Sequence, residues 1–192
     1  MTNLLVYCGS RHGTLPTYTA AARQVAIHAR DRSWGIVYGG GGVGLMGELA
    51  RTAVEHDVHV TGIIPHFLCT EEVLYRDVTE HIVVQSMHER KLMMMERAHM
   101  ILALPGGFGT MEELFEAVTW LQLGLHAKPI GVLNVDGFYD HLEAQFTTML
   151  DHGFLTPHTR SLIRVDNNLT LLLDFLEQAA SPEMSASLES RI

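Results

Sequence analysis

A glycine-rich loop followed by two acidic residues is the first feature that could do chemistry, in the segment Pro105-Gly106-Gly107-Phe108-Gly109-Thr110-Met111-Glu112-Glu113. Glycines let a backbone approach a ligand closely, and N–H groups at a helix start favour an anion. Thr110 can add a hydroxyl donor or cap the helix. Successive helical residues point about 100° apart, so at most one of Glu112 and Glu113 is expected to face a ligand. The alternative for both is a dipole-favoured place in the first helical turn.

A basic cluster of Arg90, Lys91 and Arg97 stands out because the chain carries a formal net charge of −9. Arginine binds a phosphate or carboxylate through its planar fork, and lysine binds it as a point charge. The cluster therefore suits a small anionic ligand, with a solvated helix face as the alternative. The acidic balance disfavours nucleic acid as a partner, because phosphate-backbone binding needs many cationic contacts.

A second glycine-rich segment, Gly39 to Gly47, lies earlier in the chain, and Gly42, Gly44 and Gly47 fit the pattern G-x-G-x-x-G. A dinucleotide site would also place an acid at the tip of the next strand. That strand ends Ile63-Ile64-Pro65-His66, without one. The segment therefore favours nucleotide or phosphate binding over NAD binding, and a tight structural turn is the alternative.

Alternating strand and helix patterns must position these residues, and they predict an α/β, Rossmann-like open parallel sheet with helices on both faces. The glycine loops follow strand ends, which is the sheet edge where ligands bind. Strands are expected at Leu4 to Cys8, Ile36 to Tyr38, Val58 to Ile64, Met100 to Leu104, Ile130 to Asn134 and Leu162 to Val165. Helices are expected at Tyr18 to Arg30, Leu45 to Glu55, Glu89 to Ala98, Met111 to Leu123, Tyr139 to Leu150 and Leu169 to Glu177.

Length and composition bound the remaining possibilities. The 192 residues, 47% of them hydrophobic, predict a single nucleotide-binding catalytic domain over 1–180 and a disordered tail over 181–192. Neither a signal peptide nor a membrane-spanning run is expected, so a cytoplasmic location is predicted, with no membrane partner. Cys8 and Cys69 are expected to be reduced and buried or semi-buried. The 12 histidines lack metal-ligand spacing, so no metal site is expected.

These motifs together resemble the Lonely Guy (LOG) family of phosphoribohydrolases, formerly mislabelled lysine decarboxylases. The family signature P-G-G-x-G-T-x-x-E stands at 105–113, the companion motif at Met87-His88-Glu89-Arg90-Lys91, and the first loop at Gly39 to Gly47. The resemblance covers all of the chain except its tail. It implies hydrolysis of the N-glycosidic bond of N6-modified adenosine 5'-monophosphates, or of AMP itself, releasing free base and ribose 5-phosphate.

The resemblance also implies roles for individual residues. Arg90 and Glu113 become the catalytic pair, and neither a cofactor nor a metal is implied. The small-molecule partner is a nucleoside 5'-monophosphate. The positions implied to bind it are Gly41, Gly42, Glu72, Met87, Lys91, Gly106, Gly107, Phe108, Gly109, Thr110, Met111, Glu112 and Thr119.

The resemblance further implies a homodimer with its active sites near the interface. The predicted helix after the second loop gives independent support, because Leu114, Phe115, Val118, Leu121 and Leu123 make it apolar nearly all round. A partner subunit would cover the side that the sheet does not, unless the helix Glu89 to Ala98 covers it within one subunit.

Two other functions use the same loops. A non-catalytic nucleotide or molybdenum-cofactor carrier would bind an anion without turnover, and an NAD-dependent oxidoreductase is the third hypothesis. Lysine decarboxylation is disfavoured, since amino acid decarboxylases generally use an electron-sink cofactor and no motif points to a Schiff-base lysine. In the favoured reaction a carboxylate stabilises positive charge on the sugar. Arg90 then either anchors the nucleotide or assists departure of the base.

Overall fold

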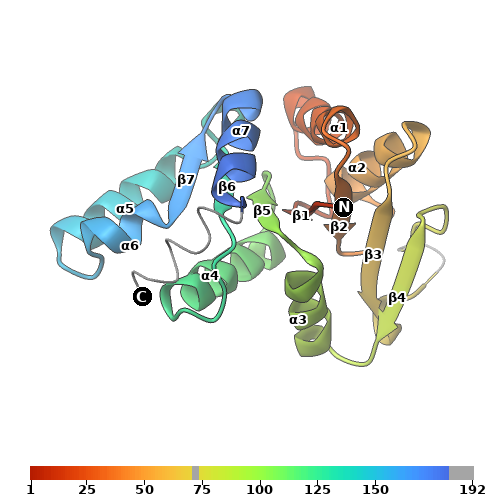
Figure 1. Ribbon diagram of the computed structural model, residues 1–192. Helices are drawn as coiled ribbons and strands as arrows, with labels where there is room; N and C mark the ends of the chain where they lie inside the picture. The colour runs from red at the N-terminus through yellow and green to blue at the C-terminus, as the bar shows by residue number, and fades with distance from the viewer. Residues whose placement is uncertain (71–73, 182–192) are drawn as a thin grey trace.

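Within the residues that the structure describes, the protein folds around one all-parallel sheet of seven strands (Figure 1). The computed structural model describes residues 1–70 and 74–181. The strand order is β4-β3-β2-β1-β5-β6-β7. The strands are β1 (Asn3–Tyr7), β2 (Gly35–Tyr38), β3 (Val60–Pro65), β4 (Glu80–Val84), β5 (Met100–Ala103), β6 (Ile130–Leu133) and β7 (Ile163–Asp166).

Helices cover both faces of the sheet (Figure 1). Helices α1 (Pro16–Asp31), α2 (Gly44–Glu55) and α7 (Leu169–Ala179) pack on one face, and α3 (Met87–Arg97), α4 (Phe108–Gln122) and α5 (Asp140–Asp151) pack on the other. The short helix α6 (Pro157–Ser161) and the 3-10 turns η1 (His66–Leu68) and η2 (Val135–Gly137) lie in connections. The predicted fold class is confirmed.

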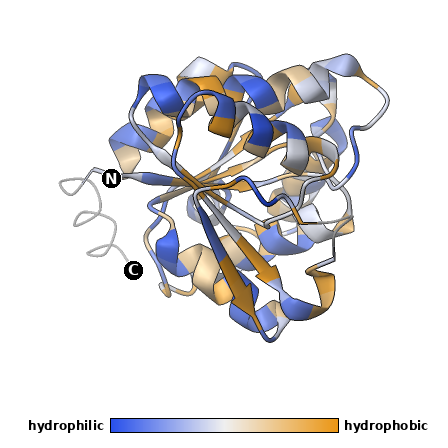
Figure 2. Cartoon of the chain, turned by 90° about the vertical axis from the view of Figure 1, so that its right-hand side faces the viewer, coloured by the Kyte–Doolittle hydropathy of each residue, from blue (hydrophilic) through white to orange (hydrophobic). Residues whose placement is uncertain are grey.

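Alternation along the strands divides the core into two layers. In β1, Leu4 and Val6 face α1, α2 and α7, whereas Leu5 and Tyr7 face α3, α4 and α5. Successive side chains of a strand point to opposite faces, so a sheet covered on both faces needs apolar residues at every position. Figure 2 shows the strands as largely hydrophobic ribbons between helices that carry hydrophilic segments.

The order of the strands reverses between β1 and β5. From β1 the chain builds outward through β2, β3 and β4, and from β5 it builds the other way. The loops that leave β1 and β5 therefore start side by side, and Gly9 N–H donates to the Pro105 carbonyl at 3.0 Å. Such a reversal opens a crevice at the carboxyl ends of the strands.

One strand and one α-helix were not predicted from the sequence. Strand β4 is a partly exposed edge strand with one buried residue, Val84, so its hydrophobic pattern is weak. Helix α6 has five residues, begins at Pro157 and is capped by the Thr156 hydroxyl, which accepts from Thr159 N–H at 3.1 Å. A helix this short carries little periodicity.

Among the predicted helix starts that were too late, two matter for the site. Helix α3 begins at Met87, because the Ser86 hydroxyl caps it by accepting from Glu89 N–H at 3.1 Å. Helix α4 begins at Phe108, three residues before the predicted start, with Gly107 as its N-cap. Thr110 is therefore not the cap, and Glu112 and Glu113 lie beyond the first turn. The helix dipole does not account for the two acids.

The remaining sequence predictions concern the chain as a whole. Cys8 is buried and Cys69 partly buried, both as free thiols, as expected. Among the described residues no helix is long and apolar enough to cross a membrane. The tail predicted over 181–192 lies outside the described residues from 182 onward. The extent of the catalytic domain over 1–180 stays a prediction.

Candidate active site

A cavity of about 490 Å³ opens at the carboxyl edge of the sheet, where the loops after β1, β2, β3 and β5 meet. It contains the predicted catalytic pair together with most of the second glycine loop. Its lining consists of Cys8, Ser10, Gly39, Gly41, Val43, Met46, Ile64, Leu68, Met87, Arg90, Gly107, Phe108, Gly109, Thr110, Glu112 and Glu113.

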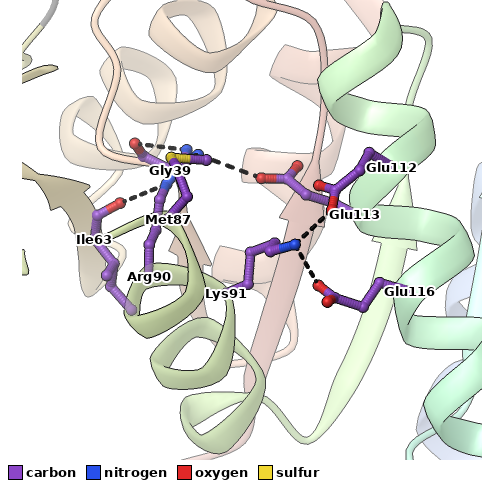
Figure 3. A network of polar contacts seen from close by, with 8 residues as sticks. All are labelled: Gly39, Ile63, Met87, Arg90, Lys91, Glu112, Glu113 and Glu116. Atoms are coloured by element: carbon purple, nitrogen blue, oxygen red, sulfur yellow. Dashed lines mark hydrogen bonds and ion pairs between the residues drawn. The ribbon is translucent and has the colours of Figure 1, made fainter.

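Backbone carbonyls hold the Arg90 guanidinium at the floor of this cavity. Its Nε donates to the Ile63 carbonyl and its Nη2 to the Gly39 carbonyl, both at 3.1 Å (Figure 3). A Cβ at position 39 would collide with Nη2, so glycine is required there for the guanidinium to fit. The ends of β2 and β3 thus fix Arg90, which is only 9% exposed.

Glu113 of α4 meets Arg90 across the sheet reversal. Arg90 Nη1 lies 3.4 Å from Glu113 Oε1, and each side chain is 11% exposed. Burial raises the pKa of Glu113 to about 7. The charge of Arg90 opposes this increase in the Glu113 pKa, as does Lys91, while Glu112 and Glu116 add to it. The carboxyl group can therefore exchange a proton near neutral pH.

Glu112 occupies a different environment from its neighbour. Both residues line the cavity, but the Glu112 side chain is 54% exposed and contacts Lys91. The expectation that at most one of the two faces the ligand is too strict. The buried contact with Arg90 still belongs to Glu113 alone.

Lys91 is bound by carboxylates and does not line the cavity. Its ammonium contacts Glu112 Oε1 and lies 2.9 Å from Glu116 Oε2, and its side chain is 11% exposed (Figure 3). Burial would lower the pKa of Lys91, but the hydrogen bonds that its ammonium donates to Glu112 and Glu116 raise the pKa above its ordinary value. Lys91 is thus a fixed cation between α3 and α4.

The start of α4 is open to the cavity. The first N–H groups of a helix have no partner within it, and those of Phe108, Gly109 and Thr110 have no acceptor among the described residues. A Cβ at Gly107 or Gly109 would meet nothing within 4 Å. Neither glycine is required by packing, so both leave room for a ligand against the backbone. Gly106 differs, because a Cβ there would collide with the Thr110 side chain.

The start of α2, after the first glycine loop, is already occupied. The Gly9 carbonyl accepts from Leu45 N–H at 3.0 Å and Met46 N–H at 3.4 Å. A Cβ at Gly44, where φ is +59°, would collide with the backbone of Ser10 and Arg11. The tight structural turn is therefore the better interpretation of G-x-G-x-x-G here. Two N–H groups at this helix start are therefore already bonded, and binding of a nucleotide or phosphate by the segment stays a prediction.

Several residues implied by the resemblance lie outside the cavity lining. Gly106 lines an adjoining cavity of about 500 Å³ with Arg11 and His12. Met111 of α4 is partly buried and packs against the core on that face of the sheet, and the Thr119 hydroxyl donates to the Phe115 carbonyl at 2.7 Å. Gly42 packs against Tyr75, with its added Cβ 3.1 Å from that side chain. Glu72 lies outside the described residues.

Sequence reasoning missed part of the lining. Cys8, to which it gave no role, and Ser10 follow β1 at the strand reversal, so the edge rule for parallel sheets could have found them. Nothing in the local pattern marks the apolar residues, which come from a loop, α2, β3 and η1 respectively: Val43, Met46, Ile64 and Leu68. Among the described residues, no group of three or more His, Cys, Asp or Glu is placed to hold a metal ion.

The fold and the site define a Rossmann-like α/β protein with a buried Arg–Glu pair at the strand reversal. A family model described as possible lysine decarboxylase matches residues 46–176. The chain is 45% identical over 175 residues to the Arabidopsis thaliana cytokinin riboside 5'-monophosphate phosphoribohydrolase LOG2, covering 91% of this chain and 82% of that protein. The chain belongs to the LOG family.

A second curated relative agrees with this assignment, and two solved structures share the fold. A probable cytokinin riboside 5'-monophosphate phosphoribohydrolase of Oryza sativa, LOG4, is 43% identical over 93% of this chain and 77% of its own length. A molybdenum cofactor binding protein of Rippkaea orientalis has a TM-score of 0.71 at 17% identity, covering 94% of this chain and 99% of that one. The Chlamydomonas reinhardtii molybdenum cofactor carrier protein has a TM-score of 0.68 at 20% identity, covering 92% and 96%. These structures share the fold.

The raised pKa of Glu113 predicts a pH-dependent stability. Folding raises the pKa of this carboxyl from 4.5 to about 7, so its contribution to the free energy of unfolding is present below pH 4.5 and is lost as the pH rises through about 7. Glu113→Gln removes the buried charge. The free energy of unfolding of the variant, relative to that of the wild type, should therefore increase between pH 5 and pH 8. The increase should be roughly 3 kcal/mol or less, at about 1.36 kcal/mol per pKa unit.

Urea unfolding at the two pH values measures the effect. Glu112→Gln is the matched control, because that side chain is half exposed, and it should show a much smaller change with pH. A stability difference between Glu113→Gln and wild type that is the same at pH 5 and pH 8 would contradict the prediction.

Proposed function

We propose that this protein hydrolyses the N-glycosidic bond of adenosine 5'-monophosphates, with or without an N6 substituent, to free base and ribose 5-phosphate. Membership of the LOG family supports the reaction class. The observation that carries the proposal is the buried Arg90–Glu113 pair, which shares one cavity with the open start of α4. This arrangement places a carboxylate and an anion site in the same cavity, where one ligand can contact both.

Glu113 is the group that acts at the sugar. Cleavage of a glycosidic bond develops positive charge on the ribose ring, and a nearby carboxylate stabilises it. The same carboxylate can orient a water molecule for attack on the anomeric carbon. With a pKa of about 7, Glu113 is partly ionised at neutral pH and can accept the proton that the water releases.

Arg90 acts beside Glu113 and does not clamp the phosphate. The edge of its guanidinium formed by Nε and Nη2 is occupied by the two carbonyls, so that edge is unavailable for a bidentate phosphate contact. Its Nη1 faces Glu113. Arg90 thereby orients the carboxylate and offers positive charge to the departing base, which favours the second of the two roles that the sequence left open.

The 5'-phosphate binds at the start of α4 in this proposal. The N–H groups of Phe108, Gly109 and Thr110 and the helix dipole favour an anion there. Thr110, 4% exposed, and Ser10 line the same cavity and can donate from their hydroxyls. The base and an N6 substituent then face the apolar lining formed by Val43, Met46, Ile64 and Leu68.

The lysines of this chain do not support the activity named in the family's description, possible lysine decarboxylase. The sequence holds two lysines, Lys91 and Lys128. Lys91 is bound by two carboxylates, and Lys128 precedes β6, at the sheet edge opposite the cavity. A Schiff-base lysine must lose its proton and reach the substrate. Neither residue combines a lowered pKa with a place in the cavity.

Substitution of the pair tests the proposed chemistry. Glu113→Gln and Arg90→Ala should each lower kcat by at least about 100-fold, since each removes charge stabilisation of the transition state. The wild type should gain activity as the pH rises through about 7, because Glu113 acts as a carboxylate. Chromatographic measurement of free adenine from AMP gives the rates, with Glu112→Gln as the matched control. A Glu113→Gln variant with near wild-type turnover would rule out Glu113 as the catalytic carboxylate.

The open start of α4 predicts a requirement for the 5'-phosphate. Adenosine and N6-prenyl adenosine should be cleaved far more slowly than their 5'-monophosphates, because the nucleosides leave that anion site empty. Competing kcat/KM measurements on nucleoside and nucleotide check this, and Gly109→Ala should raise the KM for the nucleotide alone. Similar kcat/KM values for the two substrates would show that α4 does not bind the phosphate.

A homodimer is the proposed assembly, with its interface on the face of α4 that the sheet leaves uncovered. Leu114 and Ala117 are fully buried against the sheet, whereas Phe115, Leu123 and Leu125 are 39%, 63% and 68% exposed. Apolar residues gathered in this way mark an interaction surface. A cytoplasmic location remains part of the same proposal.

Light scattering at micromolar concentration should give twice the 21.4 kDa chain mass. Leu123→Lys should shift the protein toward monomer, because it places a charge in the proposed interface, while the exposed Leu171→Lys on α7 should leave the mass unchanged. A fully active species of one chain's mass would argue against the dimer.

A further inference from the structure

Arg11 is an exposed arginine on the loop that follows β1. Within the part of the chain that the structure describes, its side chain has neither an ion pair nor a hydrogen bond. Arg90 and Lys91, in contrast, both contact carboxylates. Arg11 is therefore a cation near the candidate active site that no neighbouring acid balances.

The cavity that Arg11 lines adjoins the candidate substrate cavity. Both cavities are lined by Ser10, Gly107 and Phe108. The start of α4 is thus shared between the cavity that contains Glu113 and the cavity that contains Arg11. A ligand group bound at this helix start faces both of them.

The Thr110 hydroxyl supports a ligand oxygen at the shared helix start. Thr110 is 4% exposed and lines the candidate substrate cavity. Its hydroxyl has no hydrogen-bond partner among the described residues, although buried hydroxyls normally have one. An anion that accepts from the Phe108 and Gly109 N–H groups can also accept from this hydroxyl.

Packing fixes the backbone of Arg11 while its side chain stays free. The Gly9 N–H donates to the Pro105 carbonyl at 3.0 Å, which ties the loop after β1 to the loop before α4. A Cβ at Gly44 would collide with the Arg11 backbone nitrogen, so α2 packs closely against the same loop. A loop that is already ordered loses less entropy when its side chain binds a ligand.

A phosphate monoester at this helix start requires positive charge nearby. It carries a charge of about −1.5 to −2 at pH 7. Glu112 and Glu113 line the candidate substrate cavity and would repel it. The planar fork of an arginine can donate two parallel hydrogen bonds to a phosphate, and Arg11 has all of its donors available.

We propose that Arg11 is a substrate-binding residue whose guanidinium donates to the phosphate held at the start of α4. The identity of the phosphate as the 5'-phosphate of a nucleotide rests on the proposed function. The binding of a phosphate by Arg11 and the start of α4 does not depend on that function.

Inorganic phosphate probes the site without any turnover. NMR titration of the ¹⁵N-labelled full chain should show phosphate shifting the N–H signals of Phe108, Gly109 and Thr110, which gives a Kd. Arg11→Met removes the charge, keeps an unbranched side chain and should raise this Kd by about 10-fold or more. Arg11→Lys should retain part of the affinity, because it keeps the charge without the fork.

Arg30→Met is the matched control for net charge. Arg30 lies in the last turn of α1, where the chain has returned to the opposite edge of the sheet before β2, and its partner is the adjacent Asp31. The phosphate Kd should therefore stay at its wild-type value in this variant. Thermal unfolding checks that each variant is folded.

Turnover gives a second measurement if AMP is cleaved. Arg11→Met should raise the KM for AMP by about 10-fold and leave kcat nearly unchanged, because a contact with the phosphate is made equally in the ground state and the transition state. Cleavage of adenosine should not change, since adenosine has no phosphate.

The possible outcomes separate the inference from the proposed function. Phosphate binding that depends on Arg11, in a protein that does not cleave AMP, supports the inference and refutes the proposed function. An unchanged phosphate Kd in Arg11→Met, an equal loss in Arg30→Met, or no binding of phosphate by the wild type overturns the inference. If Arg11→Met does not fold, the wild-type Arg11 Nε–H signal decides, and a signal that phosphate does not shift overturns the inference.

Discussion

The contact between Arg90 and Glu113 depends on the way the sheet ends. Two carbonyls, of Gly39 after β2 and Ile63 in β3, fix the guanidinium from one half of the molecule. The other half delivers Glu113 on the helix that follows β5. Burying two opposite charges is costly unless both find partners; here Arg90 pairs with Glu113 and also donates to the two backbone carbonyls. The loops after β1, β2, β3 and β5 surround this pair.

The two glycine-rich segments solve different physical problems. In the first, missing side chains let one loop lie directly against another, and the Gly9 carbonyl closes the start of α2. In the second, the missing side chains face open space, and the start of α4 remains free. At one sheet edge, the start of α2 is thus bonded to a neighbouring loop, whereas the start of α4 is open. The difference lies in which backbone happens to cover each of them.

The fold could be predicted from the sequence, since buried strands, glycine loops and their order follow from local composition. The family resemblance, and not local composition, singled out Arg90 and Glu113, which the fold brings into contact. The edge strand β4 could not be predicted, because a half-exposed strand shows little hydrophobic contrast. The roles of the charged residues were also beyond local pattern. The sequence predicted that Lys91 could bind an anion, but in the fold its ammonium pairs with Glu112 and Glu116. Such pairings join helices that are far apart in sequence, and only their packing reveals them.

Because the start of α2 is covered by another loop, the two glycine-rich segments should differ in how well they tolerate substitution. At Gly44 and Gly47, in the first turn of α2, any side chain would collide with the backbone of a neighbouring loop, so substitution there should destabilise the fold. Around Gly107 and Gly109 a new side chain would meet only solvent or ligand. In directed evolution of this scaffold toward other phosphorylated compounds, substitutions should therefore be tolerated in the loop after β5 and rarely in the loop after β2.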